Sequence, residues 1–297
     1  MRKLFKWIGI TLGGLLGLLV LTAIVLYFVG GAKLSKKYDV PVQTVSIPTD
    51  ADALQRGEHL ATILICKRCH GDALSGKLEF EIPGMLSIPT PNLTSGAGGV
   101  GSFYKDEDWV RAIRHGVGHD GRALFIMMSK PYHHLGNEDV GALIAYLKSL
   151  PAVDHKLPER RIEPMGKLMM GAGLFPPFAA DQIDHAGTAP DQPEPGVTVA
   201  YGEYLSRTCT ECHGENLNGA PFGPPGEEVL TPNLTPGGEL AFWSEQQFLT
   251  TMRTGRTPGG RQLKEDMPWP YYGQMTDEEL MAIWLYLQSL PKLEQAN

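Results

Sequence analysis

The chain has 297 residues, which exceeds the usual size of a single domain, so two domains with additional segments are expected. Hydrophobic residues make up 42% of the sequence and the formal net charge is -7. This composition indicates a folded, exported protein, and its acidic balance argues against a nucleic-acid binder.

The chain begins with a short basic end, residues 1–6, followed by an almost uninterrupted apolar run from Trp7 to Gly31 with no charged residue inside it. A run of this length can cross a bilayer. A cleavable signal peptide would have a shorter apolar core, although Gly30-Gly31-Ala32 offers small residues at which a peptidase could cut. We therefore expect an uncleaved, single-pass transmembrane anchor over residues 7–31. Basic residues flank both of its ends, so the charge rule does not orient it.

All of the cysteines lie in two copies of the motif Cys-x-x-Cys-His, which are Cys66-Lys67-Arg68-Cys69-His70 and Cys209-Thr210-Glu211-Cys212-His213. In such a motif the two thiols can add to the vinyl groups of a haem, and the adjoining histidine becomes the proximal iron ligand. A zinc knuckle or a redox dithiol also uses Cys-x-x-Cys, but neither needs a histidine directly after it. The motifs predict two covalently attached haem c groups. Because this attachment takes place outside the bacterial cytoplasmic membrane, they also predict a periplasmic location for the haem domains.

The two motifs belong to an internal repeat. Thr90-Pro91-Asn92-Leu93-Thr94 returns as Thr231-Pro232-Asn233-Leu234-Thr235, and the segment 146–151 returns at 286–291. Self-similarity of this kind indicates a tandem duplication. We expect one haem domain over residues 50–153 and a second over 197–297. The intervening residues 154–196, rich in proline toward their end, are predicted to form a linker.

Apolar residues at helical spacing predict an amphipathic helix near the end of each repeat, over residues 140–147 and 280–287. A proline follows each helix, and acidic residues occupy each first turn. Asn137 and Asp277 are the predicted N-caps. A shorter helix is expected to lead into each haem motif.

Gly57 and Gly202 stand at matching positions in these shorter helices. We expect each to allow another helix to approach closely. The predicted fold is mostly α, with an N-terminal transmembrane helix followed by two tandem haem domains.

Methionine is the leading candidate for the sixth iron ligand in both domains. Met267 stands thirteen positions before the first apolar position of the second terminal helix, and the same spacing in the first repeat leads to Met127. A thioether favours ferrous iron and closes the site to other ligands. Adjacent Met128 is the alternative to Met127, and His133 or His134 leaves bis-histidine ligation of the first haem open.

Several residue patterns together resemble a known family. Thr-Pro-Asn-Leu-Thr is followed by an aromatic and acidic helix, Gly-Arg, a methionine, and a helix that ends in Tyr-Leu-x-Ser-Leu-Pro. The sequence is similar to the class I cytochrome c domains in the membrane-bound cytochrome subunits of bacterial alcohol and gluconate dehydrogenases. The resemblance covers roughly residues 50–153 and 197–293. It implies a small helical domain around each haem, with His70 and His213 proximal and Met127 and Met267 distal.

The leading hypothesis is a membrane-anchored, periplasmic dihaem cytochrome c that transfers single electrons and is itself no enzyme. Its expected partners are redox proteins at the membrane, namely a dehydrogenase, a quinol-oxidising complex, a soluble cytochrome or a terminal oxidase. It could be a permanent subunit of such a complex. The alternative hypothesis is a dihaem peroxidase, in which one haem lacks a strong sixth ligand and binds peroxide.

Overall fold

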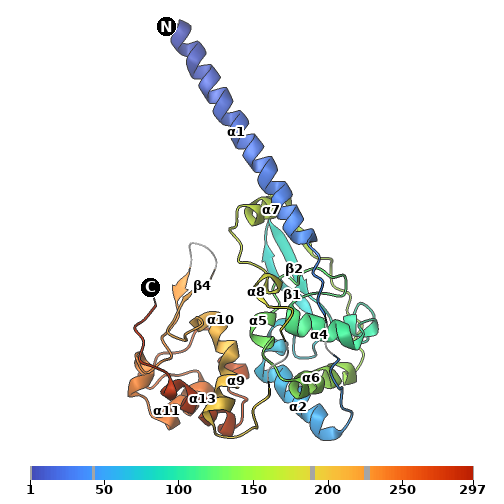
Figure 1. The fold of residues 1–297 in the computed structure, drawn as a ribbon, viewed down its shortest axis with the longest axis vertical. Coiled ribbons are helices and arrows are strands. Elements are labelled where there is room, and N and C mark those ends of the chain that lie inside the picture. Colours follow the sequence, from blue (N-terminus) through green and yellow to red (C-terminus); the bar gives the residue numbers. More distant parts are fainter. Residues whose placement is uncertain (1, 42–43, 188–190, 224–227, 297) are drawn as a thin grey trace.

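The computed structural model describes residues 2–41, 44–187, 191–223 and 228–296. A long N-terminal helix, α1 (Arg2–Ser35), leads into two lobes that lie side by side (Figure 1). The first lobe (residues 50–187) contains α2 (Ala51–Ile63), α3 (Cys66–His70), β1 (Lys77–Ile82), β2 (Leu86–Thr90), η1 (Val100–Ser102), α4 (Asp106–His115), α5 (Ser129–Tyr132), α6 (Asn137–Ser149), β3 (Arg161–Ile162), α7 (Pro164–Gly171) and α8 (Ala179–Gln182). The second lobe (residues 197–296) contains α9 (Val199–Ser206), η2 (Arg207–Cys209), α10 (Thr210–His213), β4 (Pro221–Phe222), β5 (Val229–Leu230), η3 (Glu239–Phe242), α11 (Glu245–Thr254), α12 (Trp269–Tyr272) and α13 (Asp277–Ser289). The mostly helical fold expected from the sequence is confirmed.

Helix α1 extends beyond the predicted residues 7–31 at both ends, because the flanking lysines and arginine are good helix formers. Its apolar side chains from Leu4 to Val29 are largely exposed. By length and composition α1 could cross a membrane, and among the described residues it is the single helix that meets this test.

Each lobe is built on one close pair of helices, α2 with α6 and α9 with α13. A Cβ atom at Gly57 would lie 2.1 Å from the carbonyl oxygen of Ala142, and one at Gly202 would lie 1.9 Å from that of Ala282. No side chain fits at either crossing. The predicted role of these two glycines is therefore confirmed.

The predicted N-caps of the terminal helices are wrong by one residue. Helices α6 and α13 already include Asn137 and Asp277, and the caps are Gly136 and Thr276. Thr276 and Glu279 form a reciprocal capping box, in which each side chain accepts a hydrogen bond from the other's backbone N–H. The sequence alone could not decide which residue caps each helix, because several neighbouring residues are of types that can serve as an N-cap.

The strands are few and short. In the first lobe, β2 lies between β1 and β3 in an antiparallel sheet, with an irregularity between Leu78 and Phe80. The second lobe contains the antiparallel pair β4 and β5. Strand β3 belongs to the segment 154–196, which also forms α7 and α8.

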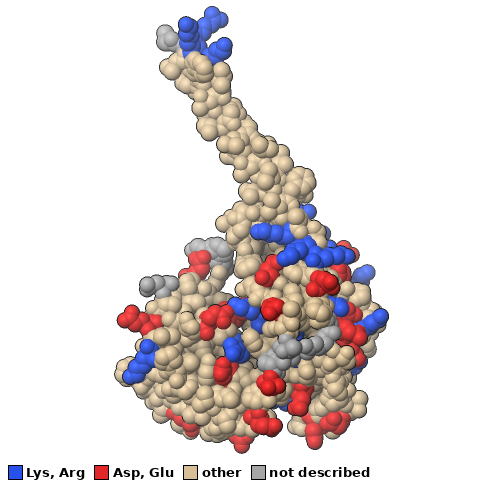
Figure 2. All heavy atoms as spheres, in the orientation of Figure 1, with Lys and Arg blue, Asp and Glu red and all other residues tan. Residues whose placement is uncertain are grey.

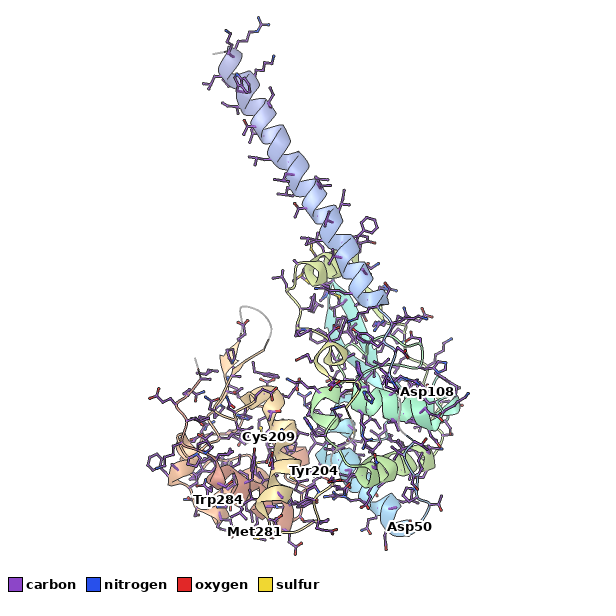
Figure 3. All side chains as sticks on the ribbon, viewed as in Figure 1. Asp50, Asp108, Tyr204, Cys209, Met281 and Trp284 are labelled. Carbon is purple, nitrogen blue, oxygen red and sulfur yellow. The ribbon has the colours of Figure 1, made fainter. Side chains whose placement is uncertain are left out.

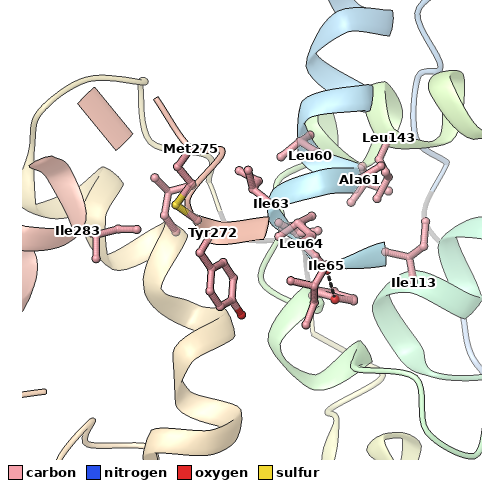
Figure 4. Close-up of a cluster of buried hydrophobic side chains, with 14 of the residues drawn as sticks. Leu60, Ala61, Ile63, Leu64, Ile65, Ile113, Leu143, Tyr272, Met275 and Ile283 are labelled. Atoms are coloured by element: carbon pink, nitrogen blue, oxygen red, sulfur yellow. Dashed lines mark hydrogen bonds between the residues drawn. The ribbon is translucent and has the colours of Figure 1, made fainter. Parts of the chain in front are cut away.

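The two lobes share one hydrophobic core. Tyr272 and Met275 of the second lobe face Ile63 and Leu64 at the end of α2, as Figure 4 shows. Short helix α12 packs on α2, and α5 of the first lobe packs on η2 of the second. Each lobe therefore places the short helix that follows its candidate methionine against the other lobe.

A buried ionic network reinforces this contact. Arg56 of α2 pairs with Asp139 of its own lobe at 2.9 Å and with Glu279 of the second lobe at 3.2 Å. The Nε2 atom of His59 lies 2.7 Å from a Glu279 carboxylate oxygen. Tyr204, which Figure 3 places at the face between the lobes, donates to Asp139 at 2.8 Å. The bonds of Glu279 to Arg56 and His59, and that of Tyr204 to Asp139, join the two lobes directly.

Candidate haem-binding sites

Each Cys-x-x-Cys-His motif forms a short helical turn at the wall of a cavity. The first cavity, of about 430 Å³, is lined by Cys66, Cys69 and His70, and the second, of about 410 Å³, is lined by the corresponding Cys209, Cys212 and His213. Both motifs end at a glycine with φ near +79°, a conformation that glycine adopts without strain. The three predicted residues of each motif are therefore brought together at one wall.

The two histidines are held in the tautomer that an iron ligand requires. Nδ1 of His70 donates to the carbonyl oxygen of Pro91 at 2.8 Å, and Nδ1 of His213 donates to that of Pro232 at 2.8 Å. A carbonyl can only accept, so the proton sits on Nδ1 and the Nε2 lone pair is free. Burial lowers the pKa of both imidazoles, which keeps them neutral.

The repeated Thr-Pro-Asn-Leu-Thr segment supplies this support, a role that the sequence analysis did not assign to it. The hydroxyl of Thr90 donates to the carbonyl oxygen of Cys69 at 2.6 Å, and the hydroxyl of Thr231 donates to that of Cys212 at 2.9 Å. Asn92 then donates to the carbonyl oxygen of Val153 at 2.7 Å, beyond the terminal helix. The segment therefore ties the haem motif to the end of its own repeat. Its recurrence at a similar distance after each histidine was the available signal.

The candidate methionines also line the cavities. Met127 and Met128 both line the first cavity, and Met267 lines the second. Met128 and Pro268 have nearly the same backbone angles, φ -77° and ψ 50° against φ -79° and ψ 49°, and each directly precedes a short helix. Met127 is consequently the structural counterpart of Met267.

The two histidines considered as alternative ligands lie elsewhere. Neither His133 nor His134 is among the described residues that line the first cavity. Nδ1 of His133 donates to the carbonyl oxygen of Arg114 at 3.1 Å, and its ring lies edge-on to His115. This arrangement gives bis-histidine ligation no support.

The remaining cavity walls suit a porphyrin. Aromatic rings, among them Tyr104 and Trp109, line the first cavity. The Nε1–H of Trp109 is buried and has no hydrogen-bond partner, and Arg122 and Arg160 line the same cavity. An unpaired indole N–H and two guanidinium groups in one cavity fit the carboxylate groups that a haem carries.

The other uses of Cys-x-x-Cys fit less well. Burial raises the pKa of Cys66 and that of Cys209 to about 12, whereas a reactive dithiol needs a lowered thiol pKa. No group of three or more potential zinc ligands occurs in the part of the chain that the structure describes. Thiols, free imidazole nitrogen, methionines and apolar walls together favour haem.

Comparison with known proteins agrees with this geometry. A family model described as Cytochrome c matches residues 54–151 and 199–291, well over half of the chain. The chain belongs to the cytochrome c family. This cytochrome carries covalently bound haem c, and the two matched regions correspond to its two motifs.

Its curated relatives include cytochrome subunits of several dehydrogenases. The cytochrome is 26% identical to the alcohol dehydrogenase (quinone) cytochrome c subunit of Gluconobacter oxydans, over 84% of this chain and 57% of the relative. It is 27% identical to the fructose dehydrogenase cytochrome subunit of Gluconobacter japonicus, over 82% of this chain and 54% of the relative. The chain thus spans just over half the length of these relatives. The matches give no support to the peroxidase alternative.

Proposed function

We propose that this cytochrome is the membrane-anchored electron-transfer subunit of a dehydrogenase, accepting single electrons and passing them to an acceptor at the membrane. The observation that carries the proposal is that each of two cavities in one body combines a thiol pair, a histidine with a free Nε2, and a methionine. The dehydrogenase partner is inferred from the likeness to cytochrome subunits of such enzymes. A soluble cytochrome or a terminal oxidase is proposed as acceptor, and a quinol-oxidising complex is proposed as a further redox partner.

We assign one role to each residue of the sites. Cys66, Cys69, Cys209 and Cys212 form the thioether bonds, His70 and His213 are the proximal ligands, and Met127 and Met267 are the distal ligands. When bound, haem iron supplies a reversible one-electron couple. Met127 and Met267 keep the sixth position filled, so that the site passes electrons and excludes small ligands.

We also propose that α1 spans the cytoplasmic membrane once and that both lobes lie in the periplasm. Covalent haem attachment outside the cytoplasm supports this orientation, and the exposed apolar surface of α1 supports the anchor. Tethering would keep the lobes at high effective concentration beside membrane partners.

The ligand assignment is tested by magnetic resonance and electronic spectra of the ferric, haem-loaded protein. Two low-spin irons with methionine-to-iron charge transfer are expected. After reduction with dithionite, Met267→Ala should make one ferrous iron bind added carbon monoxide, and Met127→Leu should do the same for the other. Met128→Leu is the matched control and should leave both spectra unchanged. If Met128→Leu rather than Met127→Leu opens the first iron, the assignment of Met127 is wrong.

The function is tested in native membranes. Affinity-tagged full-length cytochrome should be recovered together with a dehydrogenase subunit, and its haems should become reduced when that enzyme's substrate is added. Haems that stay oxidised while the co-purified dehydrogenase turns over an artificial acceptor would contradict the proposal.

A further inference from the structure

One segment outside the haem sites is unusually apolar. From Leu168 to Ala180 no side chain carries a charge or a hydrogen-bonding group, although charged residues make up 20% of the chain. The segment comprises the second half of α7, a turn at Gly173 with φ +74°, and the residues that return to the first lobe. The tip of the segment, at the turn around Gly173 and Leu174, lies on the molecular surface, and Leu174 is 49% exposed.

Helix α7 packs against the end of α1 and runs antiparallel to it. A Cβ atom at Gly30 would lie 1.8 Å from the carbonyl oxygen of Lys167, and one at Gly171 would lie 1.9 Å from that of Leu26. The two backbones therefore touch at two glycines one turn apart. Because Lys167 lies at Gly30 and Gly171 at Leu26, α7 runs along α1 away from the lobes, and Figure 1 shows it beside the end of α1.

This packing sets the level that the tip reaches. Gly171 lies beside Leu26, which is seven residues before Lys33, the first charged residue after the apolar run. At 1.5 Å per residue, the tip stands about 10 Å nearer the bilayer centre than Lys33. An α1 that spans the membrane would carry the tip of α7 to the boundary between headgroups and acyl chains.

The backbone of the tip is suited to such a place. The N–H groups of Ala172, Gly173 and Leu174 donate to the carbonyl oxygens of Leu168, Met170 and Met169, respectively, at 2.9 to 3.2 Å. The ammonium group of Lys33 also donates to the carbonyl oxygen of Met170 at 2.9 Å. Irregular backbone is tolerated at membrane depth only when its polar groups find partners within the protein.

Charged groups lie at the level of the tip and below it. Lys33, Lys36 and Lys37 follow the apolar run of α1, and Figure 2 shows basic side chains gathered where α1 meets the first lobe. The ammonium group of Lys167 lies 5.2 Å from the ring centroid of Tyr27 on α1. Basic and aromatic residues at one level are typical of a membrane–water interface.

We propose that residues 168–175, here called the membrane foot, insert into the interfacial region of the periplasmic leaflet beside α1. The inference rests on the proposed membrane anchor. The partner of this surface is the lipid bilayer, because the apolar surface of the membrane foot continues the apolar surface of α1. Two contacts with the membrane, rather than one tether, would fix the orientation of the first lobe on its surface.

The test uses single cysteine variants of the full-length, haem-loaded protein in phospholipid nanodiscs. Haem attachment occupies the native thiols, so only the introduced thiol reacts with maleimides. The rate with a charged, membrane-impermeant maleimide is divided by the rate with an apolar one, which cancels differences in thiol pKa. This ratio should be at least about tenfold lower for Leu174→Cys than for Phe242→Cys, because charged groups partition poorly into lipid.

Phe242→Cys is the matched control, since Phe242 is an apolar side chain, 88% exposed, on the second lobe. Leu19→Cys, at the middle of α1, reports on the anchor itself and should not react with the charged reagent. Equal ratios at positions 174 and 242, with position 19 protected, would overturn the membrane foot alone. Reaction at position 19 would overturn the anchor as well.

Discussion

At the residue scale, the haem sites depend on partners outside the five-residue motifs. Within each motif the sequence specifies thiols and an imidazole, but the tautomer of His70 is set by the carbonyl oxygen of Pro91, twenty-one residues away. The same holds for His213 and Pro232. A haem site of this kind therefore needs two things: the Cys-x-x-Cys-His motif, and a distant carbonyl oxygen that fixes the tautomer of the histidine.

His115 gives a residue-scale prediction about pH. Burial, with nearby His133, His185, Arg114 and Arg111, lowers its pKa to about 4. In the unfolded chain His115 takes up a proton near the ordinary histidine pKa of about 6.5, whereas in the folded protein it stays neutral until a lower pH. Acidification from about pH 7 toward about pH 4 should therefore lower the free energy of unfolding.

His115→Asn should reduce this loss, measured as the change in guanidinium unfolding midpoint between about pH 7 and about pH 5. Part of the dependence should remain, because burial also lowers the pKa of His133 and that of His134. A variant with the same pH dependence as the parent protein would show that His115 does not stay neutral in the fold.

At the element scale, the two repeats use the same helix crossing. The carbonyl oxygens of Ala142 and Ala282 occupy the space where a Cβ atom of Gly57 or Gly202 would be. These contacts involve backbone, which cannot move aside as a flexible side chain could. The α9–α13 pair positions the segment that leads directly into Cys209, so the crossing also fixes where the haem motif starts.

Gly202→Ala should therefore destabilise the second lobe by about 1–3 kcal/mol, the usual effect of overpacking. Gly259→Ala is a suitable control, because the nearest atom to a Cβ there is 4.0 Å away. Guanidinium unfolding followed by circular dichroism would compare the two variants. Equal midpoints would mean that α13 can shift to admit a methyl group.

The sequence predicted the terminal helices, the helix-crossing glycines and the cysteine motifs, because each depends on local spacing. The pairing of Arg56 with Glu279 and the packing of α7 on α1 were not predicted, since hydrophobic periodicity does not report contacts between residues far apart in the chain. The N-caps were misplaced by one residue because Asn137 and Asp277 are good capping residue types. The methionine spacing did bring Met127 into structural register with Met267.

At the scale of the whole molecule, two kinds of ion pair cross between the lobes. Arg56 joins Glu279 across the boundary and Asp139 within its own lobe, and these two carboxylate side chains are 5% and 2% exposed. Lys130 joins Glu215 at 2.5 Å, but these side chains are 36% and 66% exposed. Burial would by itself raise the pKa of Glu279, yet His59, the Thr276 N–H and the charge of Arg56 lower it. The buried pairing of Arg56 with Glu279 should therefore stabilise the contact between the lobes more than the exposed pairing of Lys130 with Glu215 does.

Arg56→Met should destabilise the protein by about 3–5 kcal/mol, because it leaves two buried carboxylates without their guanidinium partner. Lys130→Ala, which removes an exposed pair across the same boundary, should change stability by at most about 1 kcal/mol. Small-angle X-ray scattering would report whether the lobes separate. Equal effects of the two variants would contradict the ranking by burial.

The contact between the lobes has a consequence for how the protein is supplied to the membrane. Two separate single-haem chains would associate according to their concentrations, and unequal synthesis would leave one without its partner. In this chain, α2 meets α13 and α12 within one polypeptide. Both haem sites therefore arrive in equal number, and dilution does not separate them.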